Sequence, residues 1–137
     1  MASIDIIEKL VHKRLIKWYK KLLQPPVGVN GEYGDYVEYV FDRPVLFLGW
    51  KLVVTNVDTA NNETITANIT VEFENETKYA YIDLCDLSAC YRERTISRIA
   101  DLTEEGELGM VKRIRVRAKS NLATTNATVK LHVIYSG

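Results

Sequence analysis

From residue 36 to the end, apolar and polar residues alternate in short runs. Residues typical of turns separate these runs. Every second residue from Ala67 to Phe73 is apolar, and the same holds from Val129 to Tyr135. A period of two places successive side chains on opposite faces of a β-strand, so each run has one dry face and one wet face. The pattern predicts strands at 36–41, 45–57, 64–73, 78–84, 110–119 and 127–135.

Six or seven strands with turns between them are typical of an antiparallel β-sandwich. The run from Leu46 to Trp50 is apolar on both faces, which predicts a central strand with a bulge or a close approach at Gly49. Between Ser88 and Glu107 the pattern is weak, and a short helix at 95–102 is the expected insertion. The expected fold class is therefore mainly β.

The first 24 residues follow a helical period instead. Apolar residues from Ile4 to Leu22 recur at three- and four-residue spacing, which places them on one stripe of an α-helix. Ser3 is a good N-cap, and Pro25 and Pro26 end the helix because proline lacks the backbone N–H and restricts the residue before it. We expect an amphipathic helical arm at 1–24, a stiff Pro/Gly linker at 25–35 and a β-sandwich domain at 36–137.

The formal net charge is zero, with 18 Lys and Arg against 18 Asp and Glu, but the charges are unevenly distributed. The arm holds six cations against two acids, a net charge of +4, which leaves −4 on the remainder. Arms of this kind usually contact an anionic membrane, a nucleic acid or an acidic partner surface. The alternative is a helix that only covers the β-domain and leaves its basic face in solvent. The residues expected to make a contact are Lys9, Lys13, Arg14, Lys17, Trp18, Lys20 and Lys21.

The inventory of catalytic residue types is small. The only histidines are His12, in the expected helix, and His132, on the polar side of an expected strand, and neither belongs to an HxxxH or HExxH pattern. The sequence has no GxxxxGK[ST] or GxGxxG loop, and Asp83 and Asp86 do not match a calcium loop. We therefore expect no enzymatic activity, no cofactor, no metal site and no small-molecule substrate.

Cys85 and Cys90 are separated by four residues, which differs from the CxxC spacing of redox and zinc motifs. They can be two inert thiols, a local disulfide that closes a small turn, or two thiols that a strand bend separates. We favour the disulfide because the sequence between them is turn-like. A disulfide would indicate an oxidising compartment or a hyperthermophilic cell.

The expected strand at 110–119 carries the most regular charge pattern. Alternation places its apolar residues on one face and, on the other, Arg113, Arg115, Arg117 and Lys119. One interpretation is an outward salt-bridged ladder, in which the neutralising acids on a neighbouring strand are Glu72, Glu74 and Glu76. The other is that the arginines contact a neighbouring subunit or nucleic-acid phosphate. Because no aromatic series alternates with the arginines, single-strand binding of the OB-fold type is not expected.

Asn-x-Thr, the acceptor pattern for N-glycosylation, occurs more often than this composition predicts by chance. The four candidate sites are Asn62, Asn68, Asn75 and Asn126. A simpler explanation is that Thr is frequent in strands and Asn in turns. We take the excess as an indication of an exposed β-domain that faces its environment.

The whole layout resembles a single jelly-roll capsid protein of an icosahedral virus. It consists of a basic amphipathic helix, a Pro-Pro linker and a compact Thr- and Asn-rich β-sandwich that ends in Ala127-Thr-Val-Lys-Leu-His-Val-Ile-Tyr-Ser. The Asn-Thr loops and the small size are similar to those of archaeal viruses. The resemblance implies a jelly-roll sandwich that assembles with copies of itself and with other capsid subunits. It also implies that the helix meets a neighbouring subunit, an inner membrane or the packaged genome.

The leading hypothesis is therefore a structural virion protein, assembled in the host cytoplasm and located in the capsid. The runner-up is a cell-surface or filament glycoprotein module, and the third is a cytoplasmic β-sandwich binding domain whose helix docks a partner. Because the cations continue to Lys21, we expect neither a signal peptide nor a transmembrane segment. A net charge of zero suits the first hypothesis, since many copies can pack without accumulating repulsion.

Overall fold

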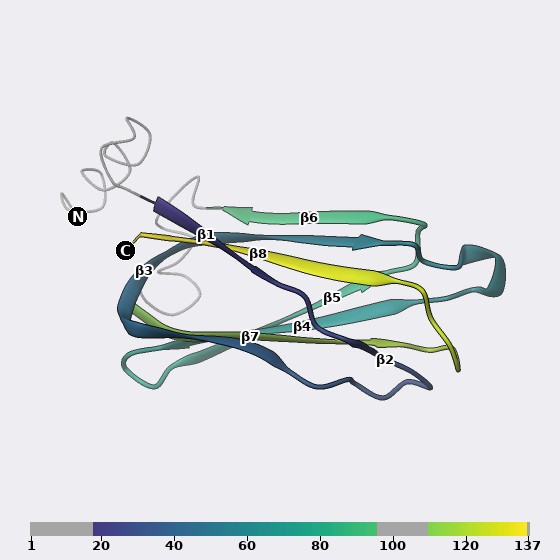
Figure 1. Ribbon diagram of the computed structural model, residues 1–137, viewed down its shortest axis with the longest axis horizontal. Helices are drawn as coiled ribbons and strands as arrows, with labels where there is room; N and C mark the ends of the chain where they lie inside the picture. The colour runs from purple at the N-terminus through teal and green to yellow at the C-terminus, as the bar shows by residue number, and fades with distance from the viewer. Residues whose placement is uncertain (1–17, 96–109, 137) are drawn as a thin grey trace.

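Strand β3 (Val37–Thr55) determines the architecture, because its 19 residues run through two layers (Figure 1). It turns from one layer to the other between Val40 and Val45, where its pairing is irregular. Pro44 lies in this bend and lacks the N–H that a ladder hydrogen bond needs. The structure, a computed structural model, describes residues 18–95 and 110–136.

The described strands form a hydrogen-bonded sheet in the order β1-β8-β3-β7-β4-β5, with β6 paired to β3 and β2 paired to β7. All of these pairs are antiparallel except that of β2 with β7. Besides β3, the elements are β1 (Trp18–Leu23), β2 (Val27–Gly28), the 3-10 helix η1 (Thr59–Asn61), β4 (Ile65–Phe73), β5 (Lys78–Cys85), β6 (Cys90–Thr95), β7 (Met110–Ser120) and β8 (Thr128–Ser136).

The bend of β3 folds this sheet into two layers that face one another (Figure 1). The first part of β3 pairs with β7, which continues to β4 and β5. The second part pairs with β6 and β8, and β8 continues to β1. The mainly β, antiparallel fold confirms the sequence-based prediction, although the strands expected at 36–41 and 45–57 are one continuous strand.

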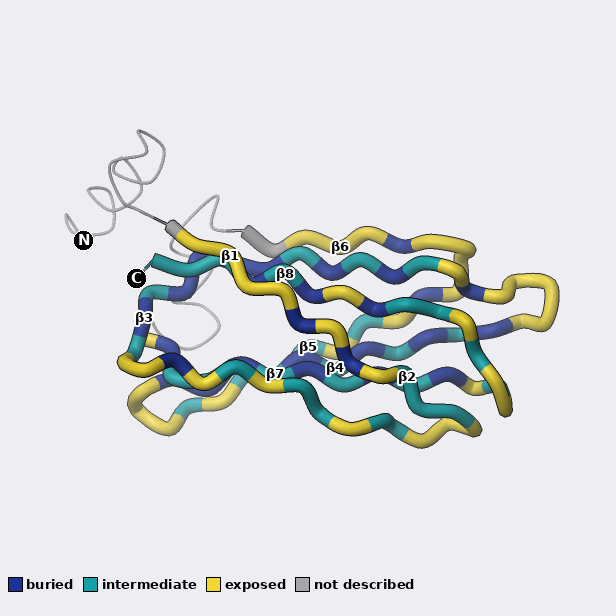
Figure 2. Tube along the Cα trace, viewed as in Figure 1, coloured by how far each residue is buried: buried dark blue, intermediate teal, exposed yellow. Residues whose placement is uncertain are grey.

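Buried residues alternate with more exposed ones along the strands of both layers (Figure 2). On β4, Ile69 is fully buried, and on β8, Val129 and Leu131 are fully buried, as the period-two pattern predicts. The rings of Trp50 and Tyr81, one from each layer, meet edge to face with their centroids 5.7 Å apart. Each buried side chain of this size contributes roughly 1.5–3 kcal/mol by leaving water. The core therefore holds the two layers together.

The helix expected within 1–24 is wrong for residues 18–23, because Trp18–Leu23 is strand β1. This strand pairs with β8 along its whole length, and Leu23 at its end is only 3% exposed. The pairing satisfies backbone groups of β8 and buries Leu23, which outweighs the local helical period. The rest of the expected helix lies outside the described residues, together with Lys9, Lys13, Arg14 and Lys17.

The segment expected as a linker, 25–35, is fastened along β7. Strand β2 pairs with Ala118 and Lys119, and three further backbone N–H groups of the segment donate to carbonyl oxygens of β7 and the loop after it. Gly28 is required in this segment, because a Cβ there would lie 2.0 Å from the carbonyl oxygen of Glu32. The segment is therefore part of the sandwich, and it places Tyr33, together with Tyr36 directly after it, on the outer face of β7.

Gly49 forms the bulge that the sequence predicts. The register of β3 against β8 shifts between Phe47 and Gly49, and Gly49 has a φ of 140°, which residues with a side chain rarely adopt. We expect Gly49→Ala to lower the free energy of unfolding, measured by urea denaturation, by about 1–3 kcal/mol. The control is Lys130→Ala at an exposed position of β8, expected to stay within about 0.5 kcal/mol. Equal effects of the two substitutions would contradict strain at Gly49.

Candidate functional site

The basic row of β7 lies on the outer face of its layer, as the alternation predicts. Ile114, Val116 and Ala118 point into the core and are fully buried. The four cations between and beside them are half-buried and point outward. They are Arg113, Arg115, Arg117 and Lys119. The structure then divides this row into two parts with different partners.

Arg113 belongs to a salt-bridge cluster. Its guanidinium pairs closely with Glu72 on β4 and lies 3.6 Å from Glu38, while Lys112 pairs with Glu72 at 3.6 Å and with Glu76 at 2.6 Å. Burial raises the pKa of Glu72, but the hydrogen bond from Arg113 and the positive charge of its guanidinium lower it. The charges of Lys112 and Lys78 act in the same direction, so the pKa of Glu72 is lowered overall. The expected neutralisation by acids is thus confirmed for this end of the row.

Arg115, Arg117 and Lys119 have aromatic partners instead. The Arg115 Cζ lies 4.4 Å from the centre of the Tyr36 ring, and the Arg117 Cζ lies 4.2 Å from Tyr33 and 4.5 Å from Tyr36. The Lys119 Nζ lies 4.6 Å from the Tyr33 ring centre. Cation–π contacts of this kind contribute about 0.5–1 kcal/mol each at exposed sites. We call these five residues the tyrosine-arginine strip.

No aromatic series alternates with the arginines along β7, as expected from the sequence, but a distant segment supplies two tyrosine rings beside them. Tyr33 and Tyr36 come from the segment beside β2, about 80 residues before β7, so periodicity along β7 alone cannot reveal them. The available signal is the glycine spacing around them, because Gly28 and Gly34 let the backbone lie close to itself. A Cβ on Gly34 would be 2.7 Å from the carbonyl oxygen of Pro26.

The rest of this outer face changes from polar to apolar towards its edge. On β4, the outward residues Thr66, Asn68 and Thr70 lie opposite the three cations of the strip. On β5, which ends the sheet order, the outward residues include Ile82 and Leu84, which are 68% and 54% exposed. Exposed apolar side chains that lie together on an edge strand are typical of an interaction surface.

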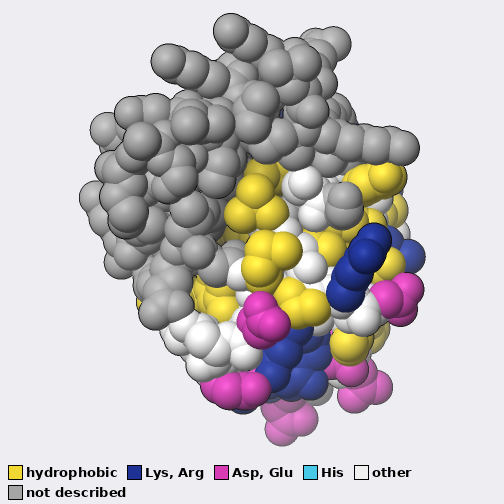
Figure 3. Space-filling view, turned by 90° about the vertical axis from the view of Figure 1, so that its left-hand side faces the viewer, with side chains coloured by type: hydrophobic (Ala, Val, Ile, Leu, Met, Phe, Trp, Pro, Cys, Tyr) yellow, Lys and Arg dark blue, Asp and Glu magenta, His cyan; other side chains and the backbone are white. Residues whose placement is uncertain are grey.

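At the opposite end of the sheet order, aromatic residues surround the bend of β3. The Tyr19 and Tyr135 rings stack with centroids 5.8 Å apart, and Phe41 meets Tyr135 edge to face at 4.8 Å. Hydrophobic side chains gather at this end above a band of charged ones (Figure 3). Of the cations expected to contact a membrane, genome or partner, Lys20 and Lys21 are on β1, and the Lys21 Nζ lies 4.9 Å from the Tyr39 ring centre. Trp18 begins β1.

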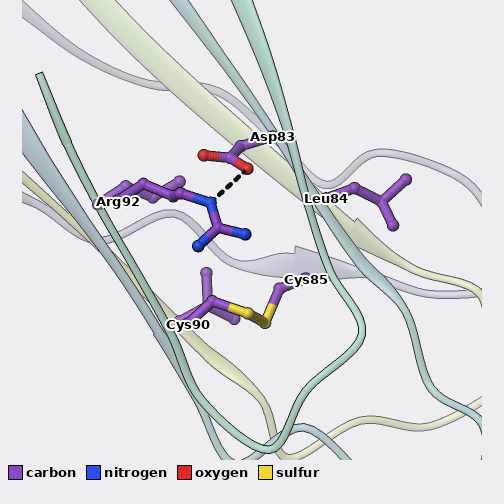
Figure 4. A pocket seen from close by; sticks show the side chains of 7 residues that line it. Asp83, Leu84, Cys85, Cys90 and Arg92 are labelled. Carbon is purple, nitrogen blue, oxygen red and sulfur yellow. Dashed lines mark hydrogen bonds and ion pairs between the residues drawn. A yellow bond between two sulfur atoms is a disulfide. The ribbon is translucent and has the colours of Figure 1, made fainter.

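The edge strands β5 and β6 belong to different layers, and a disulfide and an ion pair connect them (Figure 4). A disulfide joins Cys85 to Cys90, with the Cα atoms 5.9 Å apart. Nearby, the Arg92 Nε donates to the Asp83 carboxylate over 3.3 Å. These bonds close the side of the sandwich, and the exposed Leu87 lies in the turn between them.

The candidate glycosylation sites differ in position. Asn62, Asn75 and Asn126 are exposed in turns, whereas Asn68 is half-buried in the middle of β4. The Thr70 hydroxyl lies 3.4 Å from the Asn68 side-chain oxygen. An enzyme that modifies asparagine would therefore reach the three turn sites more easily than Asn68.

The described residues contain neither a group of three metal-binding side chains nor a helix long and apolar enough to cross a membrane. His132 is half-buried on the outer face of β8, opposite Leu22 of β1 and Lys51 of β3. His12 lies outside the described residues.

No protein-family model and no curated protein matches the chain, but solved structures do. A chain of Desmodium yellow mottle tymovirus aligns with 89% of this chain and 87% of its own length, at 10% identity and a TM-score of 0.47. VP2 in the subviral particle of infectious bursal disease virus aligns with 88% of this chain and 33% of its own, at 12% identity and a TM-score of 0.45. The family 11 carbohydrate-binding module of Clostridium thermocellum, solved with a mixed-linked tetrasaccharide, aligns with 88% and 83%, at 14% identity and a TM-score of 0.40. Each similarity is weak.

Proposed function

We propose that the chain is a jelly-roll capsid subunit, a structural protein of a virion that assembles with copies of itself and with other subunits. The observation that carries the proposal is the strand order. For this comparison the short β2 is left out and the two parts of β3 count as separate strands, which gives eight strands. Numbered 1 to 8 along the chain, strand 1 is β1, strands 2 and 3 are the first and second parts of β3, and strands 4 to 8 are β4 to β8. One layer then has the order 1-8-3-6 and the other 2-7-4-5.

This order supports the jelly roll because it places two Greek keys around one core. Strands 1 and 8 are neighbours in the first layer, and strands 2 and 7 are neighbours in the second, so the two halves of the chain wrap around each other. Jelly rolls are typical of viral capsid proteins and of lectin domains and cupins. Within that set, the exposed apolar residues on β5 favour a protein that other subunits cover.

In this proposal the edge formed by β5 and β6 contacts a neighbouring subunit. The disulfide and the Arg92–Asp83 pair keep that edge closed, while Ile82, Leu84 and Leu87 supply apolar area. The basic residues Lys9, Lys13, Arg14 and Lys17 before β1 contact an inner membrane, the genome or a neighbour. The role is structural and involves no catalysis.

Sedimentation velocity and negative-stain imaging of the purified full chain test the proposal. We expect rings, capsomers or closed shells whose fraction increases with protein concentration, because identical contacts repeat between copies. A chain that stays monomeric at millimolar concentration, with its disulfide intact and at several salt concentrations, would overturn the capsid role.

The exposed positions of Asn62, Asn75 and Asn126 favour a second candidate, a cell-surface or filament glycoprotein module. A disulfide suits such an environment as well. Intact mass of the protein from its native source separates the two. Added hexose at the turn sites together with a monomeric state would favour the glycoprotein, whereas an unmodified mass with assembly would favour the capsid subunit.

A further inference from the structure

We propose that the tyrosine-arginine strip binds the phosphate backbone of a single-stranded nucleic acid. The strip consists of Arg115, Arg117 and Lys119 on β7 with the rings of Tyr33 and Tyr36 beside them. The inference rests on the proposed function in one respect: a capsid subunit would have a reason to meet nucleic acid. The binding itself follows from the charge and geometry of this face.

Among the described residues, the three cations have no carboxylate partners like those that neutralise the other end of β7. Within residues 18–95 and 110–136, the ion pairs of β7 are those of Lys112 and Arg113. Glu38 lies opposite Arg115 in the register, and Glu32 and Asp35 belong to the same segment as the tyrosines. None of these three carboxylates forms an ion pair with the three cations within the described residues; Glu38 pairs with Arg113 instead. A row of uncompensated positive charges on an ordered surface attracts a polyanion.

The tyrosine rings hold the two guanidinium groups in place. Both arginines have their Cζ atoms within 4.5 Å of a ring centre, and their Nε atoms are buried without a hydrogen-bond partner in the described residues. The terminal N–H groups are therefore the donors that a ligand can use. A planar guanidinium that is already oriented loses less freedom when it donates two hydrogen bonds to one phosphate.

The spacing of the cations favours a polymer over a single small anion. Alternate residues of an extended strand repeat at about 6.7 Å, so a chain with one charge per unit can contact the cations in turn. On the neighbouring strand, hydroxyl and amide groups lie opposite the cations and add hydrogen-bond partners, namely Thr66, Asn68 and Thr70.

Aromatic rings beside a row of cations favour a single strand among the polyanions. Unpaired bases stack on tyrosine rings while the phosphates meet the cations. The strip lies on the outer face of a sheet, whereas the major groove of a duplex accepts a helix or a narrow ribbon. A sulfated polysaccharide would satisfy the cations but would offer no planar base to Tyr33 and Tyr36.

Fluorescence anisotropy with a labelled 20-nucleotide thymidine oligomer measures the binding. We expect the full chain carrying both Arg115→Gln and Arg117→Gln to bind roughly tenfold more weakly at about 0.1 M salt. The slope of log affinity against log salt should fall by about 0.7 for each cation removed. The matched control removes two cations from the outer face of the opposite layer, Lys51→Gln and Lys130→Gln, and should leave the affinity within about twofold.

Equal loss of affinity in the two double variants would overturn the assignment, because it would mean that only total charge matters. Stronger binding of heparin than of the oligomer, with the same sensitivity to the arginine variants, would overturn the choice of nucleic acid. Assembly is scored separately by sedimentation. If a strictly monomeric chain binds the thymidine oligomer, the capsid role is overturned and the strip remains a binding site.

A measurement on the unchanged protein guards against an arginine variant that fails to fold. Acetylation of lysine amines, read by mass spectrometry, should slow at least threefold at Lys119 when the oligomer is bound, since the phosphates cover that side chain. Lys130, on the opposite layer, should react at an unchanged rate. No protection at Lys119 at saturating oligomer would contradict the proposal.

Discussion

The proposed capsid role predicts that the chain carrying both Ile82→Lys and Leu84→Lys stays monomeric in solution under conditions in which the unchanged chain is expected to assemble. The two side chains point outward from β5 and are 68% and 54% exposed. Each gains roughly 1.5–3 kcal/mol when a neighbouring copy covers it fully, and a lysine in its place brings an unpaired charge into the contact. In the proposed shell one contact would repeat in every copy, so a loss of several kcal/mol per contact is expected to prevent assembly.

Sedimentation velocity gives the fraction assembled, and urea denaturation gives the free energy of unfolding of each variant. The outward positions leave the core intact, so the unfolding free energy should change by less than about 1 kcal/mol. The control adds the same two charges at exposed positions of η1, as Thr59→Lys and Ala60→Lys. Assembly of the β5 variant at the level of this control would contradict a subunit contact at the edge of β5 and β6.

The strands were predictable because their signal is local. Burial of one face imposes a period of two, and that period is visible from Ala67 to Phe73 and from Val129 to Tyr135. The bulge at Gly49 was predictable for a related reason, since glycine in an apolar strand marks a place where a side chain does not fit. The pairing of β1 was not predictable, because its apolar residues also fit a helix and only β8 decides between the two.

The candidate site was half predictable. The row of cations follows from alternation along β7, and Glu72 as a partner of Arg113 follows from expecting an acidic strand beside it. The tyrosines over Arg115 and Arg117 depend on how a segment far away in the sequence crosses β7, and no period records that crossing. The two exposed residues on β5 look like ordinary strand residues until the sheet order shows that β5 is an edge.

Glu63 carries the largest expected effect on the stability of the folded protein. The residue is only 1% exposed, yet its carboxylate has no ion-pair partner within the described residues. The Ser120 hydroxyl donates to it over 2.6 Å, and the backbone N–H of Asp58 donates over 2.9 Å. Ser120 also accepts from the backbone N–H of Leu122 over 3.1 Å. This carboxylate therefore fastens the loop before β4 to the loop after β7.

Glu63→Gln should lower the free energy of unfolding by about 2–4 kcal/mol at neutral pH. The variant keeps the size of the side chain but removes the charge and one accepting oxygen, so the Ser120 hydroxyl and the Asp58 N–H can no longer both donate to a charged carboxylate. Urea denaturation measures the loss. Glu74→Gln, at an exposed position without an ion-pair partner among the described residues, is the control and should stay within about 0.5 kcal/mol.

The same carboxylate should make stability depend on pH. Burial raises the pKa of Glu63, but the hydrogen bonds from Ser120, the backbone of Asp58 and Thr125 outweigh it and hold that pKa below the ordinary glutamate value. A carboxyl group whose pKa is lowered by folding stabilises the protein above the pKa of its unfolded state. That stabilisation is lost as the pH falls through the unfolded-state value towards the lower pKa of the folded state. Glu72 adds a loss of the same sign, because its pKa is lowered as well.

Denaturation of the two chains at a series of pH values between 7 and 3 separates these contributions. The unchanged protein should lose stability steadily towards acid, and the Glu63→Gln variant should lose less, because only Glu72 and the other carboxyl groups still titrate in it. The difference between the two free energies of unfolding should therefore shrink as the pH falls. A difference that stays constant from pH 7 to pH 3 would mean that folding leaves the pKa of Glu63 unchanged, and one that grows towards acid would mean that folding raises it. Either result would contradict a carboxylate that these hydrogen bonds stabilise in its charged form.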